Sequence, residues 1–319
     1  DLKTVEDSKG PRDSKELIYD QIIEDLTFAE EHLPLRSEYS ASDEGRINKG
    51  AAKILFGKVY LTKGDFQKAK DKLAEVVEHE SEYGFGLHKD YHANWLRDTE
   101  AGIEAVLYIE YKEPPFQHNG EMALAGPKYS IPGSLGISAL NEADIPTQEL
   151  YDQFDNRDLR KKTNFKTEFA HLKTGEILKS SIPLSGKFWV EGLETGDRCD
   201  VNMHIIRYAD AILMYAEALN EVGESTKALA MLNRIRERAF GDDSGNFKPM
   251  SKDEFRTAIL NERRLEFPHE GHRWFDLVRT GTFIQRMKEH SAYEAKVAEA
   301  NKTEIAQNIK EHMILMPIP

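Results

Sequence analysis

Two segments of this chain, residues 51–77 and 209–235, carry the same helix–glycine–helix pattern, and this repeat limits the possible folds more than any other feature. Each has an apolar helical stretch that ends at a glycine, Gly64 or Gly223, with an alanine five residues further on. Glycine lets the chain turn tightly at a helix C-terminus, and a small side chain lets two helices approach closely. The spacing predicts antiparallel helix pairs of the tetratricopeptide kind. In the first copy the matching positions also include Gly57, Tyr60, Phe66 and Ala69.

One or two such pairs cannot bury their own apolar faces, so further helices must stack against them. The periodicity of apolar residues predicts helices over 13–33, 49–63 and 65–79, from 203 onward, and over 251–290. Two of these helices begin with capping-box spacing, in which a polar N-cap residue is followed three positions later by glutamate. The two pairs are Asp13 with Glu16 and Ser251 with Glu254.

The segment 81–202 has a different composition, because glycine and proline gather in it. Stretches rich in β-branched and aromatic residues predict short strands at 105–111 and 186–192, with long loops between them. The predicted organisation is a tetratricopeptide-like helical region at 1–80, a loop-rich subdomain at 81–202, and a second helical region at 203–319. We expect a mainly α fold: a tetratricopeptide-like scaffold of helical pairs with an irregular, loop-rich subdomain that contains a few short strands.

The charge balance argues against some partners. Lys and Arg number 43 against 56 Asp and Glu, a formal net charge of −13, so the surface repels nucleic-acid phosphates and anionic lipid headgroups. The single cysteine, Cys199, allows no intrachain disulfide. No window of about 18 apolar residues is present, so no membrane span is predicted. The chain opens on Asp1 without a signal-peptide pattern, so we expect it to begin partway into a gene product.

One helical segment, 253–281, combines carboxylates, arginines and a histidine. Glu262 and Glu266 are four residues apart and share a helix face, and His272 follows. Neighbouring arginines lower carboxylate pKa values, whereas a general acid needs the opposite shift. We therefore expect a structural Arg–carboxylate network that ties helices together. Its predicted members are Glu262, Arg263, Arg264, Glu266, Arg273 and Asp276, joined by Arg279, Arg207 and Asp210.

Other patterns that could carry catalysis or bind a metal are incomplete. His88 and His92 are four residues apart, but they lack the glutamate of the HExxH pattern. Cys199 has no paired histidine motif, and Ser134 stands in GSLG, where a nucleophile elbow would read GxSxG. No phosphate-binding loop or dinucleotide fingerprint is present. The sequence predicts no catalytic residue, no metal site and no cofactor.

Five motifs, in order along the chain, resemble those of the SusD/RagB family of surface nutrient-binding lipoproteins. The most specific is ERRLEF-x-x-EGHRWFDLVRTG at 262–281. The others are GRINKGAAKILFGKVYLTKGDFQKA (45–69), IPTQELYDQFDNRDLRKKTNF (145–165), IIRYADAILMYAEALNEVG (205–223) and ILMPIP (314–319). Because the motifs cover nearly the whole chain in the family's order, the chain is identified as resembling this family throughout.

This resemblance implies a tetratricopeptide scaffold with a less regular ligand-binding subdomain, and a function in binding rather than bond cleavage. The protein would capture oligosaccharides or polysaccharides at the cell surface and deliver them to a SusC-like TonB-dependent transporter of the outer membrane. A lipid anchor would hold the full-length protein on that membrane, and neither the anchor cysteine nor a signal peptide is in this chain. Family members are usually longer, so part of the binding face is expected to lie outside it.

Sugar recognition requires exposed aromatic rings, which stack on the apolar faces of pyranose rings, together with planar polar side chains. Aromatic residues at helical core spacing are instead expected to be buried: Phe56, Tyr60, Phe66, Tyr208, Tyr215, Trp274 and Phe275. The loop 112–136 is the best candidate for ligand contact, since its aromatic and polar residues stand among prolines and glycines. The predicted ligand-binding residues are Phe116, His118, Asn119 and Tyr129 in this loop, with Trp189, Trp95 and Tyr91 outside it. For Trp95, packing is the favoured interpretation and ligand contact the alternative.

Three alternatives remain open on the sequence. A RagB-like protein of the same transporter class would bind peptides, using exposed carboxylates or strand edges in its pocket. A cytosolic tetratricopeptide scaffold would bind a partner protein's tail, but it would carry more regular repeats and no long Pro/Gly region. A glycoside hydrolase built as an α-toroid would need two carboxylates in loops at a cleft, and the available ones are Asp144, Glu149, Asp152 and Asp155.

Overall fold

The computed structural model describes residues 13–112, 119–131 and 135–297. Helices dominate these residues, and the mainly α fold predicted from the sequence is confirmed. The α-helices are α1 (Lys15–His32), α2 (Lys49–Lys63), α3 (Phe66–Val77), α4 (Glu80–Tyr83), α5 (Glu121–Ala125), α6 (Gln148–Gln153), α7 (Lys161–Asn164), α8 (Tyr208–Glu221), α9 (Ser225–Phe240), α10 (Lys252–Glu266), α11 (His272–Arg279) and α12 (Phe283–Val297).

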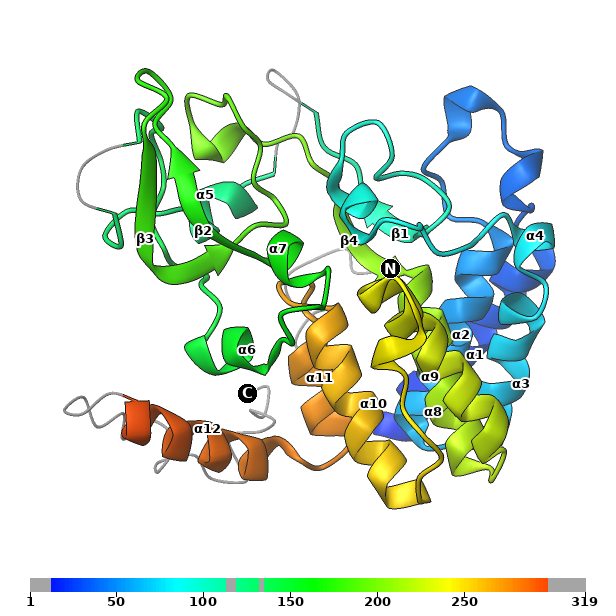
Figure 1. Ribbon diagram of the computed structural model, residues 1–319. Coiled ribbons are helices and arrows are strands. Elements are labelled where there is room, and N and C mark those ends of the chain that lie inside the picture. Colours follow the sequence, from blue (N-terminus) through cyan, green and yellow to red (C-terminus); the bar gives the residue numbers. More distant parts are fainter. Residues whose placement is uncertain (1–12, 113–118, 132–134, 298–319) are drawn as a thin grey trace.

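The strands form two separate antiparallel pairs. The first joins β1 (Ala105–Ile109) to β4 (Met203–Arg207), so it links the loop-rich segment to the second helical region. The second is a hairpin of β2 (Phe165–Ala170) and β3 (Ile177–Ser185). Figure 1 shows the hairpin on one side of the molecule and the helical pairs on the other, with α10 and α11 between them.

The two repeat segments form the helix pairs that the sequence predicts. α2 packs on α3, α8 packs on α9, and α3 packs on α8, so the four helices make one layered array. Gly64 ends α2 in the left-handed conformation, with φ 78°, as expected of a C-cap glycine. Both repeats contribute fully buried side chains to the core between the pairs, among them Leu73, Val76, Leu232 and Ile235.

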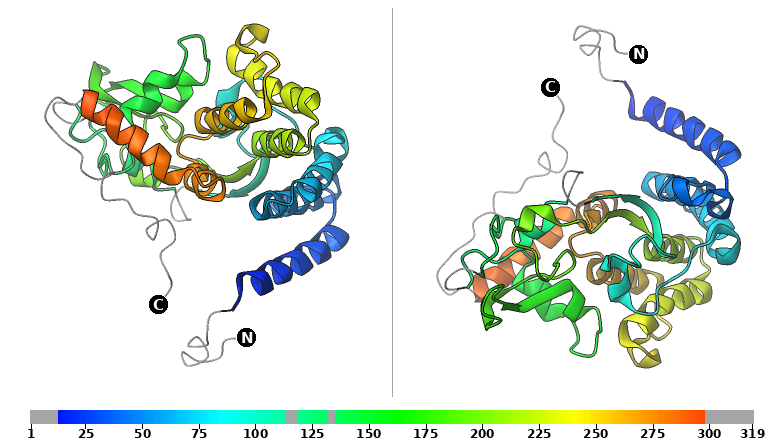
Figure 2. Two further views of the ribbon diagram at one scale, coloured as in Figure 1. Left: turned by 90° about the horizontal axis from the view of Figure 1, so that it is seen from below. Right: turned by 90° about the horizontal axis from the view of Figure 1, so that it is seen from above.

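The outer helices complete this array. α1 packs on α2, and Figure 2 shows it at the outer edge of the helical layers, while α10 packs on α8. The capping box predicted at Ser251 and Glu254 is present at the start of α10. At α1 the predicted N-cap, Asp13, is wrong by one residue: Ser14 caps the helix, and its hydroxyl accepts the backbone N–H of Leu17.

Two predicted elements in the middle of the chain are wrong. Residues 186–192 turn instead of extending, because β3 ends at Ser185 and the N–H of Trp189 bonds back to the carbonyl of Gly186 at 3.3 Å. The predicted helix from residue 203 begins only at Tyr208. The preceding MHIIR is strand β4, because its β-branched residues pair with β1.

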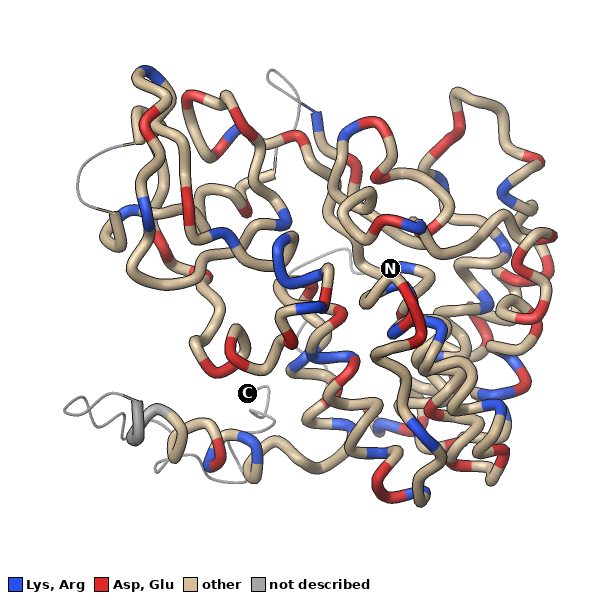
Figure 3. The backbone as a smooth tube through the Cα atoms, in the orientation of Figure 1, with Lys and Arg blue, Asp and Glu red and all other residues tan. Residues whose placement is uncertain are grey.

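Figure 3 shows Lys and Arg interspersed with Asp and Glu over both the helical pairs and the β2–β3 hairpin. None of the helices in the described ranges has the length and apolar composition that a membrane span requires.

Candidate ligand-binding cleft

A buried cluster of charged side chains, the inner ion cluster, joins the loop-rich segment to the helical array. It brings together five cations and five carboxylates from positions as far apart in the sequence as 104 and 270. Its center is Glu266, which lies 2.9 Å from Arg160 and 3.1 Å from Arg207 and also pairs with Arg238. The members are Arg160, Lys187, Arg207, Arg236 and Arg238 with Glu104, Asp158, Glu262, Glu266 and Glu270.

The surrounding cations keep the Glu266 and Glu270 carboxylates of this cluster ionised. Burial alone would raise the pKa of Glu266, but Arg238, Arg207 and Arg160 outweigh burial and lower the pKa to about 2. The same competition, with Arg207 and Lys187 as the cations, lowers the pKa of Glu270 strongly. A carboxylate that never holds a proton near neutral pH cannot act as a general acid, so these residues hold the structure together.

A second group, the outer ion cluster, ties α8, α10 and α11 together. Arg263 lies 2.6 Å from Asp210 and 2.8 Å from Asp276. Arg279 bonds Asp276 at 2.8 Å and also pairs with Glu217. Four of the six residues predicted for a structural network, Glu262, Arg263, Glu266 and Asp276, therefore lie in one of the two buried clusters.

The other two residues predicted for the network lie outside these clusters. Arg264 pairs with Glu149 of α6 at 2.9 Å, in a half-buried position. Arg273 lies outside both clusters, and its hydrogen bond goes to the backbone carbonyl of Leu260 at 3.3 Å. The expectation that Arg273 pairs with a carboxylate in the network is therefore wrong, because α11 directs this guanidinium to a different side of α10.

Two buried histidines make the stability of this fold sensitive to acid. Burial lowers the pKa of His204 and of His272 to about 4, whereas an unfolded histidine takes up a proton near pH 6.5. Between about pH 4 and pH 6.5 these histidines are protonated in the unfolded chain but neutral in the folded protein. The free energy of unfolding therefore decreases as the pH falls. Glu100 acts in the opposite direction, because burial raises its pKa to about 7.

We expect a net loss of about 3 kcal/mol between pH 6.5 and pH 4 from these three groups. Urea denaturation followed by circular dichroism at pH 7, 5.5 and 4.5 measures it. The double variant His204→Gln/His272→Gln should no longer lose stability as the pH falls, and the remaining effect of Glu100 should make it more stable at pH 5.5 than at pH 7. A wild-type midpoint that does not move with pH would contradict the assignment.

A cleft of about 820 Å³ lies next to these clusters, where α11 faces the loop-rich segment. This volume is within the range of small-molecule pockets, which often form between subdomains. One wall comes from α6 and the residues before it, and another from β4 and the segment that joins α10 to α11. Its apolar lining consists of Pro146, Leu150, Phe188, Met203, Ile205, Phe267, Pro268, Trp274 and Phe275.

Two aromatic residues of α11 line this cleft with their rings exposed. Trp274 is 44% exposed and Phe275 is 68% exposed, so the expectation that both are core residues is wrong. His272 and Asp276 are one turn apart and buried, which defines the inner face of α11. Since successive helical residues are about 100° apart, Trp274 lies on the opposite face. The spacing of His272 and Asp276 in the sequence could have indicated that Trp274 lies on the outer face of this helix.

Polar groups lie beside these rings. His269 lies 3.2 Å from Asp144, and this hydrogen bond lowers the pKa of the Asp144 carboxyl. His269 has φ 59°, a left-handed conformation that is uncommon for a residue with a side chain. Burial and the nearby Asp144 raise the pKa of Glu121, on the wall that faces α11. The cleft thus combines apolar rings with hydrogen-bonding groups of both signs.

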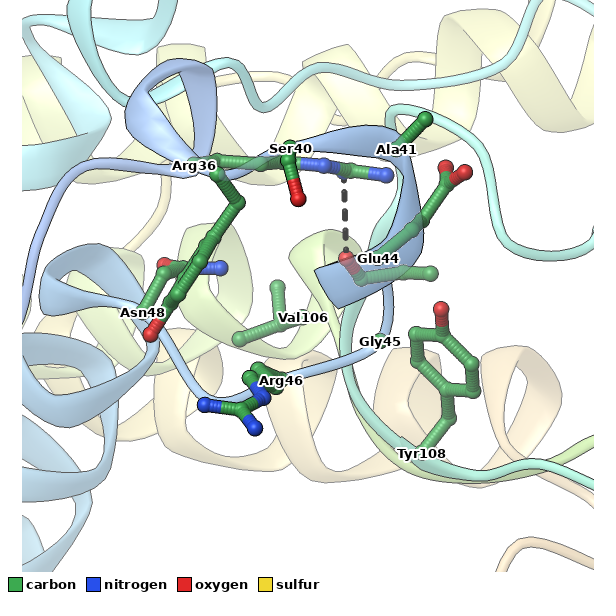
Figure 4. A pocket seen from close by; sticks show the side chains of 11 residues that line it. Arg36, Ser40, Ala41, Glu44, Gly45, Arg46, Asn48, Val106 and Tyr108 are labelled. Atoms are coloured by element: carbon green, nitrogen blue, oxygen red, sulfur yellow. Dashed lines mark hydrogen bonds between the residues drawn. The ribbon is translucent and has the colours of Figure 1, made fainter.

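A smaller pocket of about 230 Å³ lies between residues 36–48 and β1. Figure 4 shows Arg36 reaching across it, with a hydrogen bond of 3.4 Å to the carbonyl of Ala105, and Tyr108 on its other side. Arg36 also bonds the carbonyls of Gly102 and Ala101. Its guanidinium is occupied by backbone, so this pocket is a less suitable ligand site than the cleft.

Among the described residues predicted to bind ligand, Tyr91, Trp95 and Trp189 pack in one hydrophobic cluster. Asn119 bonds Val201 of that cluster, whereas Tyr129 lies outside it. Phe116 and His118 lie outside the described residues. Tyr91, Trp95 and Asn119 are 3%, 4% and 2% exposed, so the expectation that they contact ligand is not met, because no ring face or amide is open to solvent.

These three side chains have structural contacts instead. The Tyr91 hydroxyl lies 2.7 Å from the carbonyl oxygen of Glu266, and the Tyr91 and Trp95 rings pack with centroids 4.8 Å apart. The Asn119 amide donates to the carbonyl of Val201 at 2.8 Å. The Tyr91 bond fixes the loop-rich segment onto α10, and the other two contacts hold the loop-rich segment together.

Tyr129 and Trp189 keep accessible surface. Tyr129 is 75% exposed, and the three backbone N–H groups of residues 128–130 bond the carboxylate of Glu142, which fixes this turn. Trp189 is half-buried, with its ring edge-to-face on Phe169 at 4.7 Å. Both remain proposed ligand contacts on the β2–β3 side of the molecule.

The remaining candidates from the sequence have other partners. Cys199 is buried, and burial raises the pKa of its thiol to about 11. Glu149 pairs with Arg264, Asp155 with Arg157, and Asp152 with Tyr293. Within the part of the chain that the structure describes, no three His, Cys, Asp or Glu side chains converge as metal ligands do.

Known proteins share both the sequence and the fold. A family model for the SusD family matches residues 181–319. The SusD-like protein P2 of Formosa agariphila is 30% identical over 304 residues, which are 85% of this chain and 57% of that protein. A SusD homolog from Bacteroides thetaiotaomicron superposes with a TM-score of 0.78 at 24% identity, over 96% of this chain and 68% of that one. Surface glycan-binding protein A from Bacteroides thetaiotaomicron, solved in complex with laminarihexaose, superposes with a TM-score of 0.69 at 20% identity, over 85% of this chain and 62% of that one.

The helical pairs, the loop-rich segment and the two strand pairs together form a fold of the SusD class. The chain belongs to the SusD/RagB family. It spans a little over half the length of the Formosa agariphila relative.

Proposed function

We propose that this chain is part of a surface protein that captures glycans and delivers them, uncleaved, to a TonB-dependent transporter. The observation that carries the proposal is the exposed Trp274 ring, which lines an 820 Å³ cleft beside polar side chains. An exposed indole is a suitable platform for the apolar face of a pyranose ring. The laminarihexaose complex of a protein with the same fold supports a glycan as the ligand.

The other cleft residues suit this ligand. Thr147 and His269 supply hydroxyl and ring-nitrogen partners for sugar hydroxyls, and Phe275 extends the apolar surface. The loop surface with Tyr129 and Trp189 remains a second proposed contact for a long chain. Each sugar ring buries little area and must be ordered on binding, so affinity for short oligosaccharides is expected to be weak.

The remaining parts of the proposal rest on the family. Delivery to a SusC-like transporter, attachment to the outer membrane by a lipid anchor, and the division at 1–80, 81–202 and 203–319 are proposed on that basis. Co-purification of the protein with a SusC-like transporter from solubilised outer membranes tests the delivery step.

One observation favours a second function, hydrolysis. Glu121 and Asp144 both line the cleft, and their pKa values are shifted in opposite directions, as in acid–base pairs of glycosidases. The comparisons favour binding, since the relatives are SusD-like and glycan-binding proteins. The appearance of reducing ends on incubation with glycans, lost in Glu121→Gln, would establish hydrolysis instead.

Replacing Trp274 with alanine is expected to weaken glycan binding about tenfold or more, a loss of about 1.4 kcal/mol. Calorimetry against a panel of neutral polysaccharides measures the effect. The change should leave folding intact, because the ring is nearly half exposed and contacts Phe283 edge-on. Trp274→Phe should retain most of the binding.

Tyr129→Ala is the matched variant on the loop surface. If Tyr129→Ala weakens binding and Trp274→Ala does not, the contact lies on the loop surface and the cleft assignment is wrong. Binding of peptides in place of every glycan would overturn the choice of ligand.

A further inference from the structure

The cleft contains a cationic side chain that no carboxylate of the described residues neutralises. Arg273 lines the cleft from α11, and within the described residues no carboxylate lies at ion-pair distance from it. Its hydrogen bond to the Leu260 carbonyl is long, at 3.3 Å, and uses one of five N–H donors.

The other cations that line the cleft have carboxylate partners. Lys58 lies 3.0 Å from Asp210, Arg263 lies 2.6 Å from the same carboxylate, and Arg264 lies 2.9 Å from Glu149. These pairs are part of the scaffold, so the cations in them are not available to a ligand. The Arg273 guanidinium has no such partner among the described residues, so it is available.

The surroundings of Arg273 add positive charge. Burial first, and then the neighbouring Arg264 and Arg286, lower the pKa of Arg273 to about 10. It remains protonated at neutral pH, and an anion beside it would relieve the repulsion among the three guanidinium groups. Asp276 and Glu149 act in the opposite direction, but both are already paired with other arginines.

The position of Arg273 beside an exposed ring indicates what kind of anion fits. Trp274 follows directly on α11 and presents its ring to the same cleft. A guanidinium bonds carboxylates and sulfates with two parallel N–H donors. A sugar that stacks on Trp274 and carries an acidic substituent would engage both residues.

We propose that the cleft selects glycans with acidic sugars, and that Arg273 binds the carboxylate or sulfate group of the sugar stacked on Trp274. This inference rests on the proposed glycan-binding function and names its substrate class. Four carboxylates also line the cleft. Glu270 is paired with Arg207, and Asp276 is paired with Arg263. Asp144 is bonded to His269, and Glu121 comes from a different wall.

The experiment compares matched ligands. Oligogalacturonate, the same oligosaccharide after chemical reduction of its carboxyl groups, and a sulfated galactan with its desulfated form are titrated into the full chain by calorimetry. At least one acidic ligand should bind tenfold or more tightly than its neutral counterpart. The carboxylate and sulfate arms distinguish the two possible sources of the anion.

Arg273→Ala should remove this preference, because it should weaken binding of the acidic ligand tenfold or more and binding of the neutral ligand much less. Arg273→Lys should restore part of the preference. Arg157→Ala removes an arginine that is 62% exposed and paired with Asp155 outside the cleft, and it serves as the matched control. Inorganic sulfate should compete with the acidic ligand in the wild type but not in Arg273→Ala.

Two results would overturn the inference: no acidic ligand is preferred by the wild type, or the preference survives in Arg273→Ala. Both results leave the proposed function intact if neutral glycans bind to the wild type and Trp274→Ala weakens that binding about tenfold or more. A melting curve of Arg273→Ala close to that of the wild type is expected, since the lost contact is one long hydrogen bond to backbone.

Discussion

Replacing Glu266 with alanine is expected to destabilise the protein by about 3–5 kcal/mol. Glu266 is fully buried and pairs with Arg160, Arg207 and Arg238. Its removal leaves positive charge in the interior without its central counter-ion, and a buried charge that loses its partner costs far more than an exposed one. This amount is a large part of the stability of an ordinary domain.

The effect can be measured by urea denaturation at pH 7. Glu168→Ala is the matched control, because Glu168 pairs with Lys179 in an exposed position, 3.1 Å apart. Exposed pairs contribute less than about 1 kcal/mol. If both variants lose the same small amount, the inner ion cluster does not stabilise the fold in the way that its burial indicates.

The second large effect is expected at Gly57, where α2 and α3 cross. A Cβ atom at this position would lie 2.5 Å from Cγ of Leu73, well inside van der Waals contact. Leu73 is fully buried in the core. Gly57→Leu should therefore cost about 3 kcal/mol, because packed cores accommodate extra atoms only by shifting backbone or side chains.

A double variant separates crowding from other effects. Leu73→Ala alone creates a cavity and should cost about 2–5 kcal/mol. If the two side chains compete for one space, Gly57→Leu/Leu73→Ala should be clearly more stable than the sum of the single losses predicts. Additive losses would show that the clash is not the cause. Gly64→Ala, at a C-cap with no atom within 4 Å, tests backbone strain alone.

The structure also shows which expectations about the ion network and the ligand contacts depend on tertiary packing. The motif at 262–281 predicts an ion network, and its residues form part of the two ion clusters. That they also line the cleft was not predicted. The sequence predicts ligand contacts at loop aromatics because loops are usually exposed. Tyr91 and Trp95 are instead buried beneath the ion pairs of Lys187 and Arg207. An aromatic residue in a glycine-containing segment can therefore still be buried, as Tyr91 and Trp95 are.

The sequence by itself determined the helix pairs, their glycine turns, the cap at Ser251 and the family. Each of these depends on residues a few positions apart, so its physics is local. Only the tertiary structure decided which charges meet, that Arg160, Lys187 and Glu104 join Glu266, and that Trp274 and Arg273 stay open in a cleft. Those outcomes depend on contacts between segments about a hundred residues apart, and no local pattern encodes which distant side chain will neutralise a buried charge.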